Sequence, residues 1–127
     1  MHINHVAIWV SDLEKMKEFY CTFFNGQPNE KYCNESKGFE SYFISFGSGA
    51  RLELMKMKTR TGKAAGTDCI GLTHIALSAG SAPLVDSLTQ KIHAAGFALV
   101  SNPRTTGDGY YESVVCDPEG NILEITE

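Results

Sequence analysis

The chain has 127 residues, of which 43% are hydrophobic and 10% aromatic, so it can fold around a core as one domain of ordinary size. Its formal net charge is −4 and its 11 lysines and arginines do not cluster, which argues against nucleic acid as a partner. No apolar run approaches the roughly 20 residues that span a bilayer, and the amino-terminal residues show no signal-peptide pattern, so we expect a cytoplasmic protein with no membrane partner.

The first half of the chain predicts a strand, a helix and three further strands. Residues 3–10 alternate and are rich in branched and aromatic side chains, which indicates a strand. Ser11 and Glu14 fit a capping box at the start of a helix, with Ser11 as the N-cap. Gly26 is expected to end the helix because glycine tolerates the left-handed conformation. The apolar stripe of this helix is Leu13, Met16, Tyr20, Phe23 and Phe24, and the later strands are expected at about 29–34, 39–46 and 51–57.

The second half repeats this order of elements. A strand is expected over residues 72–79, and a helix opens after Ser81 with Pro83 in its first turn, where a missing N–H costs nothing. Its expected apolar stripe is Leu84, Leu88, Ile92 and Ala95, and further strands are expected at about 97–101, 110–116 and 121–126. Each half therefore reads βαβββ, which indicates one supersecondary unit used twice.

The predicted fold is α+β, a single domain over residues 1–127 built from two tandem βαβββ modules. The first module covers residues 1–57 and the second covers 71–127. A polar and basic stretch, 58–70, connects them. Four scattered cysteines without a C-x-x-C motif are expected to be reduced and structural: Cys21, Cys33, Cys69 and Cys116.

Two histidines and two glutamates occupy matched places in the two modules. His5 and His74 lie on the first strand of each module, and Glu53 and Glu124 lie on a later strand at nearly the same spacing. Because side chains alternate along a strand, each His and Glu falls opposite the aliphatic residues that should pack on the helix. A buried carboxylate needs a compensating charge, and a divalent cation would supply one. The alternative is that these are ordinary half-exposed sheet residues.

Four stretches carry a resemblance to a known family: residues 5–8, 18–26, 73–77 and 117–124. The turn from Asp117 to Asn121, before a strand that bears a glutamate, is the most specific of them. Over nearly its whole length the chain resembles the glyoxalase/bleomycin-resistance/extradiol-dioxygenase superfamily, also called vicinal oxygen chelate proteins. The order His, Glu, His, Glu is similar to that of glyoxalase I (lactoylglutathione lyase).

The resemblance implies curved mixed sheets that form a metal-lined cavity. It implies one divalent ion per site, Ni, Co, Zn, Mn or Fe, held by His5, Glu53, His74 and Glu124. It also implies a metal-dependent lyase or isomerase in which the ion chelates vicinal oxygens of a small carbonyl-derived substrate. Glu124 is then the leading proton-transfer base and Glu53 its symmetry-related partner. A homodimer is also implied, with each site drawing ligands from both chains.

Substrate contacts are expected from Trp9, which shares a strand and face with His5, and from Met55, which shares them with Glu53. Tyr110 and Tyr111 straddle the strand at 110–116, so only one of them can face the site, and Tyr110 is expected there. Glyoxalase I commonly has an arginine four residues after its first metal histidine, where it grips glutathione's glutamyl carboxylate, and this chain has Trp9 there. Lysines or arginines elsewhere, such as Arg60 or Arg104, are possible substitutes, whereas His2 and His93 are expected at the surface. The open alternatives are a non-heme iron dioxygenase and a non-catalytic, antibiotic-resistance-type binding protein of the same superfamily.

Overall fold

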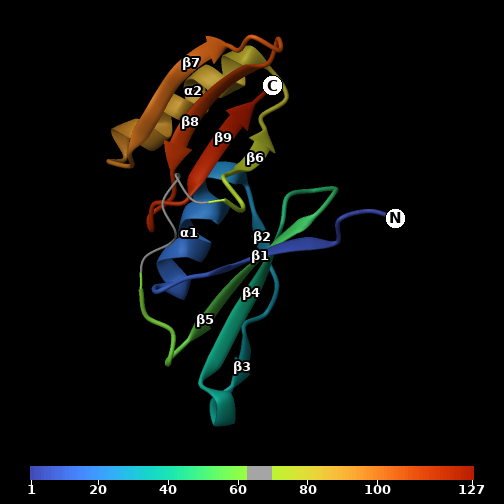
Figure 1. Ribbon diagram of the computed structural model, residues 1–127, viewed down its shortest axis with the longest axis vertical. Helices are drawn as coiled ribbons and strands as arrows, with labels where there is room; N and C mark the ends of the chain where they lie inside the picture. Colours follow the sequence, from blue (N-terminus) through green and yellow to red (C-terminus); the bar gives the residue numbers. More distant parts are fainter. Residues whose placement is uncertain (63–69) are drawn as a thin grey trace. The chain divides into compact units, whose positions relative to one another are not determined.

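Residues 1–62 and 70–127 are described by the computed structural model, and the chain divides into two compact units, Met1–Lys63 and Ala64–Glu127 (Figure 1). Residues 63–69 of the predicted connector, including Cys69, lie outside the described residues. Within the described ranges, no helix is both long and apolar enough to cross a membrane.

The first unit is a mixed sheet with one helix. Its elements are β1 (His5–Trp9), α1 (Leu13–Phe24), β2 (Gln27–Pro28), β3 (Tyr32–Asn34), the 3-10 turn η1 (Glu35–Lys37), β4 (Phe39–Ser45) and β5 (Arg51–Met57). The strand order is β1-β5-β4-β2, and β3 also pairs with β4. The pair β1 and β5 is parallel, and the others are antiparallel.

The second unit repeats this design, as Figure 1 shows for each unit by itself. Its elements are β6 (Ile75–Ser78), α2 (Ala82–Ala94), β7 (Leu99–Thr105), β8 (Tyr111–Cys116) and β9 (Ile122–Thr126). The strand order is β6-β9-β8-β7, with β6 parallel to β9.

The two units also share one register. Ala7 pairs with Glu53 across β1 and β5, and Ala76 pairs with Glu124 across β6 and β9. Each module therefore places its glutamate at the same point of the same parallel strand pair. The predicted α+β fold with two tandem modules is confirmed.

In each unit the helix covers one face of the sheet and leaves the other face open. In the first unit α1 contacts β4 and β5 through a buried stripe: Leu13, Met16, Phe19 and Tyr20. Leu52 and Leu54 of β5 are buried, whereas Glu53 between them is half-buried on the opposite face. The same alternation holds in β9, where Leu123 and Ile125 are fully buried on either side of Glu124. Strand periodicity thus directs both glutamates away from the helices.

Two details at the ends of α1 differ from the prediction. The N-cap is Asp12 and not Ser11, because the Asp12 carboxylate accepts a hydrogen bond from the Lys15 N–H at 3.1 Å. The Glu14 carboxylate accepts hydrogen bonds from Lys17, one turn further along α1, and from the Tyr42 hydroxyl on β4. At the other end Asn25, with φ 53°, takes the left-handed position expected of Gly26. Gly26 is needed for space, since a Cβ there would lie 2.5 Å from Ile44 Cγ2.

In place of the strand predicted at 29–34, the structure has β2 at Gln27–Pro28 and β3 at Tyr32–Asn34. Between them the Asn29 N–H still donates to the Phe43 carbonyl at 3.0 Å, but the Phe43 N–H is accepted by the Asn29 side-chain Oδ1 at 2.7 Å in place of a backbone carbonyl. The stripe predicted for α2 is also wrong in part, since its buried residues are Val85, Thr89 and Ile92 while Leu84 is exposed. Thr89 tolerates burial because its hydroxyl bonds to the Val85 carbonyl and to Ser113 Oγ, both at 2.6 Å.

Candidate metal centre

The open face of the first sheet brings His5 and Glu53 together. The imidazole Nε2 of His5 lies 3.6 Å from Oε2 of Glu53. The histidine side chain is 40% exposed and the glutamate 15%, so solvent or a ligand reaches the imidazole more easily than the carboxylate. This is an arrangement in which a carboxylate and a ring nitrogen converge at an accessible surface.

The second sheet carries the same pair. Nε2 of His74, the residue just before β6, lies 3.1 Å from Oε2 of Glu124, and the two side chains are 38% and 22% exposed. The same atoms therefore meet at the same register in both units. The structure thus brings each predicted His close to the predicted Glu of the same module.

Asn4 fixes the orientation of the first imidazole. Its Oδ1 lies 3.0 Å from Nδ1 of His5 and accepts a hydrogen bond from Nη2 of Arg51 at 2.9 Å. The arginine can only donate, so the atom facing it is the amide oxygen. The same oxygen can accept a hydrogen bond from Nδ1–H of His5, and that tautomer would leave Nε2 available to a metal ion. The ring of Phe43 packs edge-on against His5 with centroids 5.3 Å apart.

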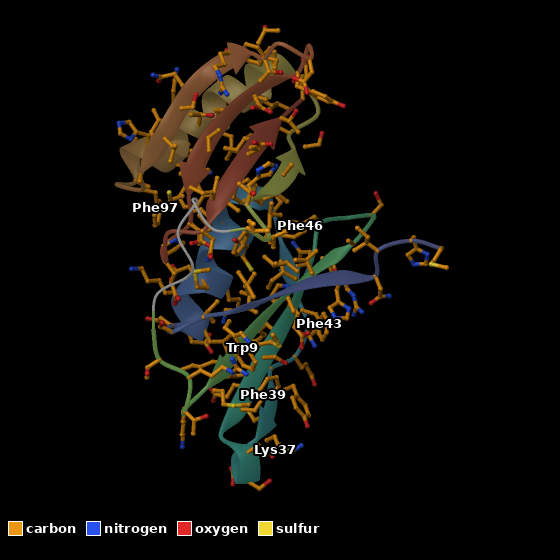
Figure 2. The ribbon with its side chains drawn as sticks, in the orientation of Figure 1. Trp9, Lys37, Phe39, Phe43, Phe46 and Phe97 are labelled. Atoms are coloured by element: carbon orange, nitrogen blue, oxygen red, sulfur yellow. The ribbon has the colours of Figure 1, made fainter. Side chains whose placement is uncertain are left out.

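The two expected substrate contacts of the first unit lie on this same open face. Trp9 is exposed and its ring meets Phe39 edge-on at 6.1 Å (Figure 2). The Arg60 guanidinium lies 4.4 Å from the Trp9 ring centroid, so this arginine stacks on the indole. Met55 is half-buried and pairs with Trp9 across the parallel strands.

In the second unit Tyr110 and Tyr111 differ in what they contact. The Tyr111 hydroxyl donates to Oδ1 of Asp86 on α2 at 2.7 Å, so Tyr111 faces the helix, and this bond raises the pKa of Tyr111. Tyr110 immediately precedes β8 and is exposed. On the strand itself Glu112 is buried and lies 3.6 Å from the Arg104 guanidinium. Arg104 therefore has a carboxylate partner within its own unit.

Each pair suits two ligands of one divalent ion. Two ligand atoms roughly 2.1 Å from an ion in cis positions stand about 3 Å apart, close to the observed 3.6 and 3.1 Å. In residues 1–62 and 70–127, no three His, Cys, Asp or Glu side chains form a group that could hold a metal ion. Each unit by itself thus supplies half of the predicted four-ligand set.

Among the described residues, the carboxyl with the largest pKa shift is on the helix of the first unit and is none of the four predicted ligands. Hydrogen bonding to Lys17, aided by Lys31 and Tyr42, lowers the pKa of Glu14 on α1 to about 2. Burial raises the pKa values of the Cys21 and Cys116 thiols, which suits structural cysteines, and neither is in a disulfide.

Sequence reasoning missed Asn4, Phe43 and Glu112. Phe43 is recognisable only after β4 and β5 are paired, because its register partner is Glu53. Asn4 had a signal in the sequence, since a polar amide directly before a candidate ligand is suited to orient it.

The chain is similar to a known protein family and to individual relatives. A family model described as the Glyoxalase/Bleomycin resistance protein/Dioxygenase superfamily matches residues 2–125. The chain is 28% identical over 127 residues to YqjT of Bacillus subtilis (strain 168), a protein described as uncharacterized, and the match covers 97% of this chain and 96% of YqjT.

Two solved structures share the fold. A glyoxylase/bleomycin resistance protein/dioxygenase domain from Frankia sp. EAN1pec has a TM-score of 0.85 at 17% identity, covering 99% of this chain and 96% of that one. Glyoxalase I from Zea mays has a TM-score of 0.77 at 19% identity, covering 98% of this chain but 44% of the maize chain. This chain therefore spans less than half the length of the maize enzyme, and at these identities the likeness concerns the fold alone.

Proposed function

The chain belongs to the Glyoxalase/Bleomycin resistance protein/Dioxygenase superfamily, and from this membership and its duplicated His–Glu pairs we propose that it is a metal-dependent lyase or isomerase of the glyoxalase I type. Its substrate would be a small carbonyl-derived molecule with vicinal oxygens. The proposal also places the protein in the cytoplasm.

The observation that carries the proposal is the repetition of one donor pair. In both units a histidine Nε2 and a glutamate Oε2 meet on the open face of the sheet, at 3.6 and 3.1 Å. A fold alone needs no such pair, because the core of each unit is complete behind the sheet. We therefore assign His5, Glu53, His74 and Glu124 as the four ligands of one divalent ion per site. A ligand set made only of imidazole nitrogens and carboxylate oxygens suits Ni, Co, Zn, Mn or Fe.

The glutamates also carry the proton transfer in this proposal. A bound divalent ion would supply Lewis-acid polarisation of the substrate oxygens. Glu124 would accept the C–H proton and return it to the neighbouring carbon, with Glu53 as its counterpart. The two glutamate side chains are 15% and 22% exposed, so each carboxylate lies at the surface of the open face within reach of a bound substrate.

Substrate recognition is assigned to Trp9, Met55 and Tyr110. Trp9 and Met55 lie side by side on the open face that carries Glu53. Their apolar surface favours an apolar or aromatic substituent over the charged glutamyl end of glutathione. The exposed Tyr110 adds a hydroxyl from the second unit.

The test is metal content with matched variants. Purified protein loaded with each candidate metal should hold one ion per site, and alanine at any of the four ligands should reduce that content. Glu124→Gln should keep the fold and lose turnover of methylglyoxal with a panel of thiols, because an amide cannot take the proton. Wild-type metal content in all four alanine variants would refute the site. Metal binding with iron-dependent oxygen consumption, or with no turnover at all, would instead favour the dioxygenase or the binding protein.

We further propose a twofold homodimer in which His5 and Glu53 of one chain and His74 and Glu124 of the other complete each site. Each unit supplies two donors, so a second unit is required in any case. Mixing His5→Ala and His74→Ala chains should place both lesions in one site and leave the other intact. That heterodimer should regain up to half of wild-type metal binding. A monomer that holds metal through all four ligands would contradict the shared site.

A further inference from the structure

A hollow of about 210 Å³ lies beside the first His–Glu pair, at the end of the sheet where β4 turns into β5. It is lined by the residues before β1, His2 and Asn4, by Arg51, and by the turn at 45–49. The turn includes Phe46, which Figure 2 labels, and two glycines, Gly47 and Gly49. No aspartate or glutamate lines this hollow, so its charge comes from Arg51.

Arg51 is held in place without a charged partner. Its Nη2 donates to Asn4 Oδ1 at 2.9 Å, and its guanidinium carbon lies 4.4 Å from the centroid of the Phe43 ring. Within the described residues it forms no ion pair, unlike Arg104, which pairs with Glu112. A guanidinium has five N–H donors, and the bond to Asn4 uses one of them. The side chain is therefore preorganised with donors available for an anion.

The turn that lines the hollow together with Arg51 carries backbone N–H groups that could serve as donors. Gly47 and Gly49 have φ values of 89° and 88°, and no atom lies within 4 Å of where a Cβ would stand on either. Among the described residues the N–H groups of Gly47, Ser48 and Gly49 donate no backbone hydrogen bond. Successive free amides in a turn are suited to bind anions.

The fold itself does not require this arrangement. The second unit has the same strand register, but Thr73 stands before His74 where Asn4 stands before His5, and Ile122 stands two residues before Glu124 where Arg51 precedes Glu53. The arginine and its asparagine anchor are therefore specific to the first unit. Their position adjoins the His5–Glu53 pair, because Asn4 contacts both His5 and Arg51.

We propose that this hollow is an oxyanion site, in which Arg51 and the amides of the 47–49 turn bind a carboxylate or phosphate group. The volume fits such a group with a short part of the molecule that carries it. The anion site stands whether or not a metal binds. A second step, which rests on the proposed function, is that the bound group is the anionic end of the substrate, held next to His5 and Glu53.

The test uses metal-free protein, so a failure of the proposed metal chemistry leaves its result intact. Inorganic phosphate and acetate are titrated separately while backbone amide signals are followed by NMR. We expect saturable shifts at Gly47, Ser48 and Gly49 with at least one of the two anions. The anion that saturates, or binds more tightly, identifies the oxyanion.

Variants separate a built site from general attraction of anions. Arg51→Gln should weaken binding at least ten-fold, and Arg51→Lys, which keeps the charge but loses the fork of donors, should weaken it less. Arg60→Gln is the matched control, because Arg60 carries the same charge in the same unit but stacks on Trp9. Shifts that fail to saturate with both anions would overturn the proposal, as would equal losses in folded Arg51→Gln and Arg60→Gln.

Discussion

Replacing Asn4 by alanine tests whether the residue before His5 prepares that imidazole for a metal ion. The change removes the oxygen 3.0 Å from Nδ1 of His5, which favours the tautomer with its hydrogen on Nδ1 and with Nε2 available to a metal ion. Loss of such an outer partner typically costs 10–100-fold in metal affinity. The His5 side chain is 40% exposed, so water can replace the amide in part. We therefore expect the lower end, about 10-fold or roughly 1.4 kcal/mol.

The assay is a competition titration of Zn²⁺ or Co²⁺ between the protein and a chromophoric chelator. Thr73→Ala is the matched control, because Thr73 precedes His74 as Asn4 precedes His5. It should change affinity by less than about two-fold, and Asn4→Asp should preserve affinity because it keeps an acceptor behind the imidazole. Equal affinities of Asn4→Ala, Thr73→Ala and wild type would refute the reasoning about the tautomer.

Three further outcomes are expected. Ile125→Ala, at a fully buried site, should lower the free energy of unfolding by about 2–5 kcal/mol, whereas Leu84→Ala, at a side chain that is 53% exposed, should change it by less than about 0.5 kcal/mol in urea titrations. The pKa of Glu14 falls from 4.5 to about 2 on folding, so its contribution to stability is present above pH 4.5 and is lost as pH drops toward 2. Glu14→Gln should flatten that part of the acid-unfolding curve, by under about 1 kcal/mol because the ion pairs are solvent-screened. Because Trp9 stands in place of an arginine, the protein lacks one charge-assisted contact to the glutamyl carboxylate of glutathione, worth roughly 1.5–3 kcal/mol. Calorimetry should therefore show weak binding of a glutathione conjugate, and tight, salt-sensitive binding would contradict this.

The repeated module and the faces of its strands could be predicted from the sequence. Side chains alternate between the two faces of a strand whatever the strand pairs with. The positions of Leu52 and Leu54 therefore predict the face of Glu53 before any partner strand is known. The same holds for Glu124 between Leu123 and Ile125. The pattern occurs in both halves of the chain, and in both the structure places the His and the Glu on the face that the alternation predicts. The start of α1 was predicted one residue early, because Ser11 and Asp12 both suit an N-cap and in the structure it is the Asp12 carboxylate that accepts the Lys15 N–H.

The tertiary structure alone decided which segments far apart in the chain come into contact. Asn4 meets Arg51 and Phe43 meets His5 only because β5 pairs with β1 on one side and with β4 on the other. The hollow at the 45–49 turn exists for the same reason. Burial of the polar Thr89 is not predictable from its neighbours in the sequence, because it depends on the hydrogen bond between its hydroxyl and Ser113 of β8. The sequence by itself determined which side of each strand carries the metal-type donors, since that is a local property. Which neighbours orient those donors depends on strand pairing, a property of the whole fold that no local pattern encodes.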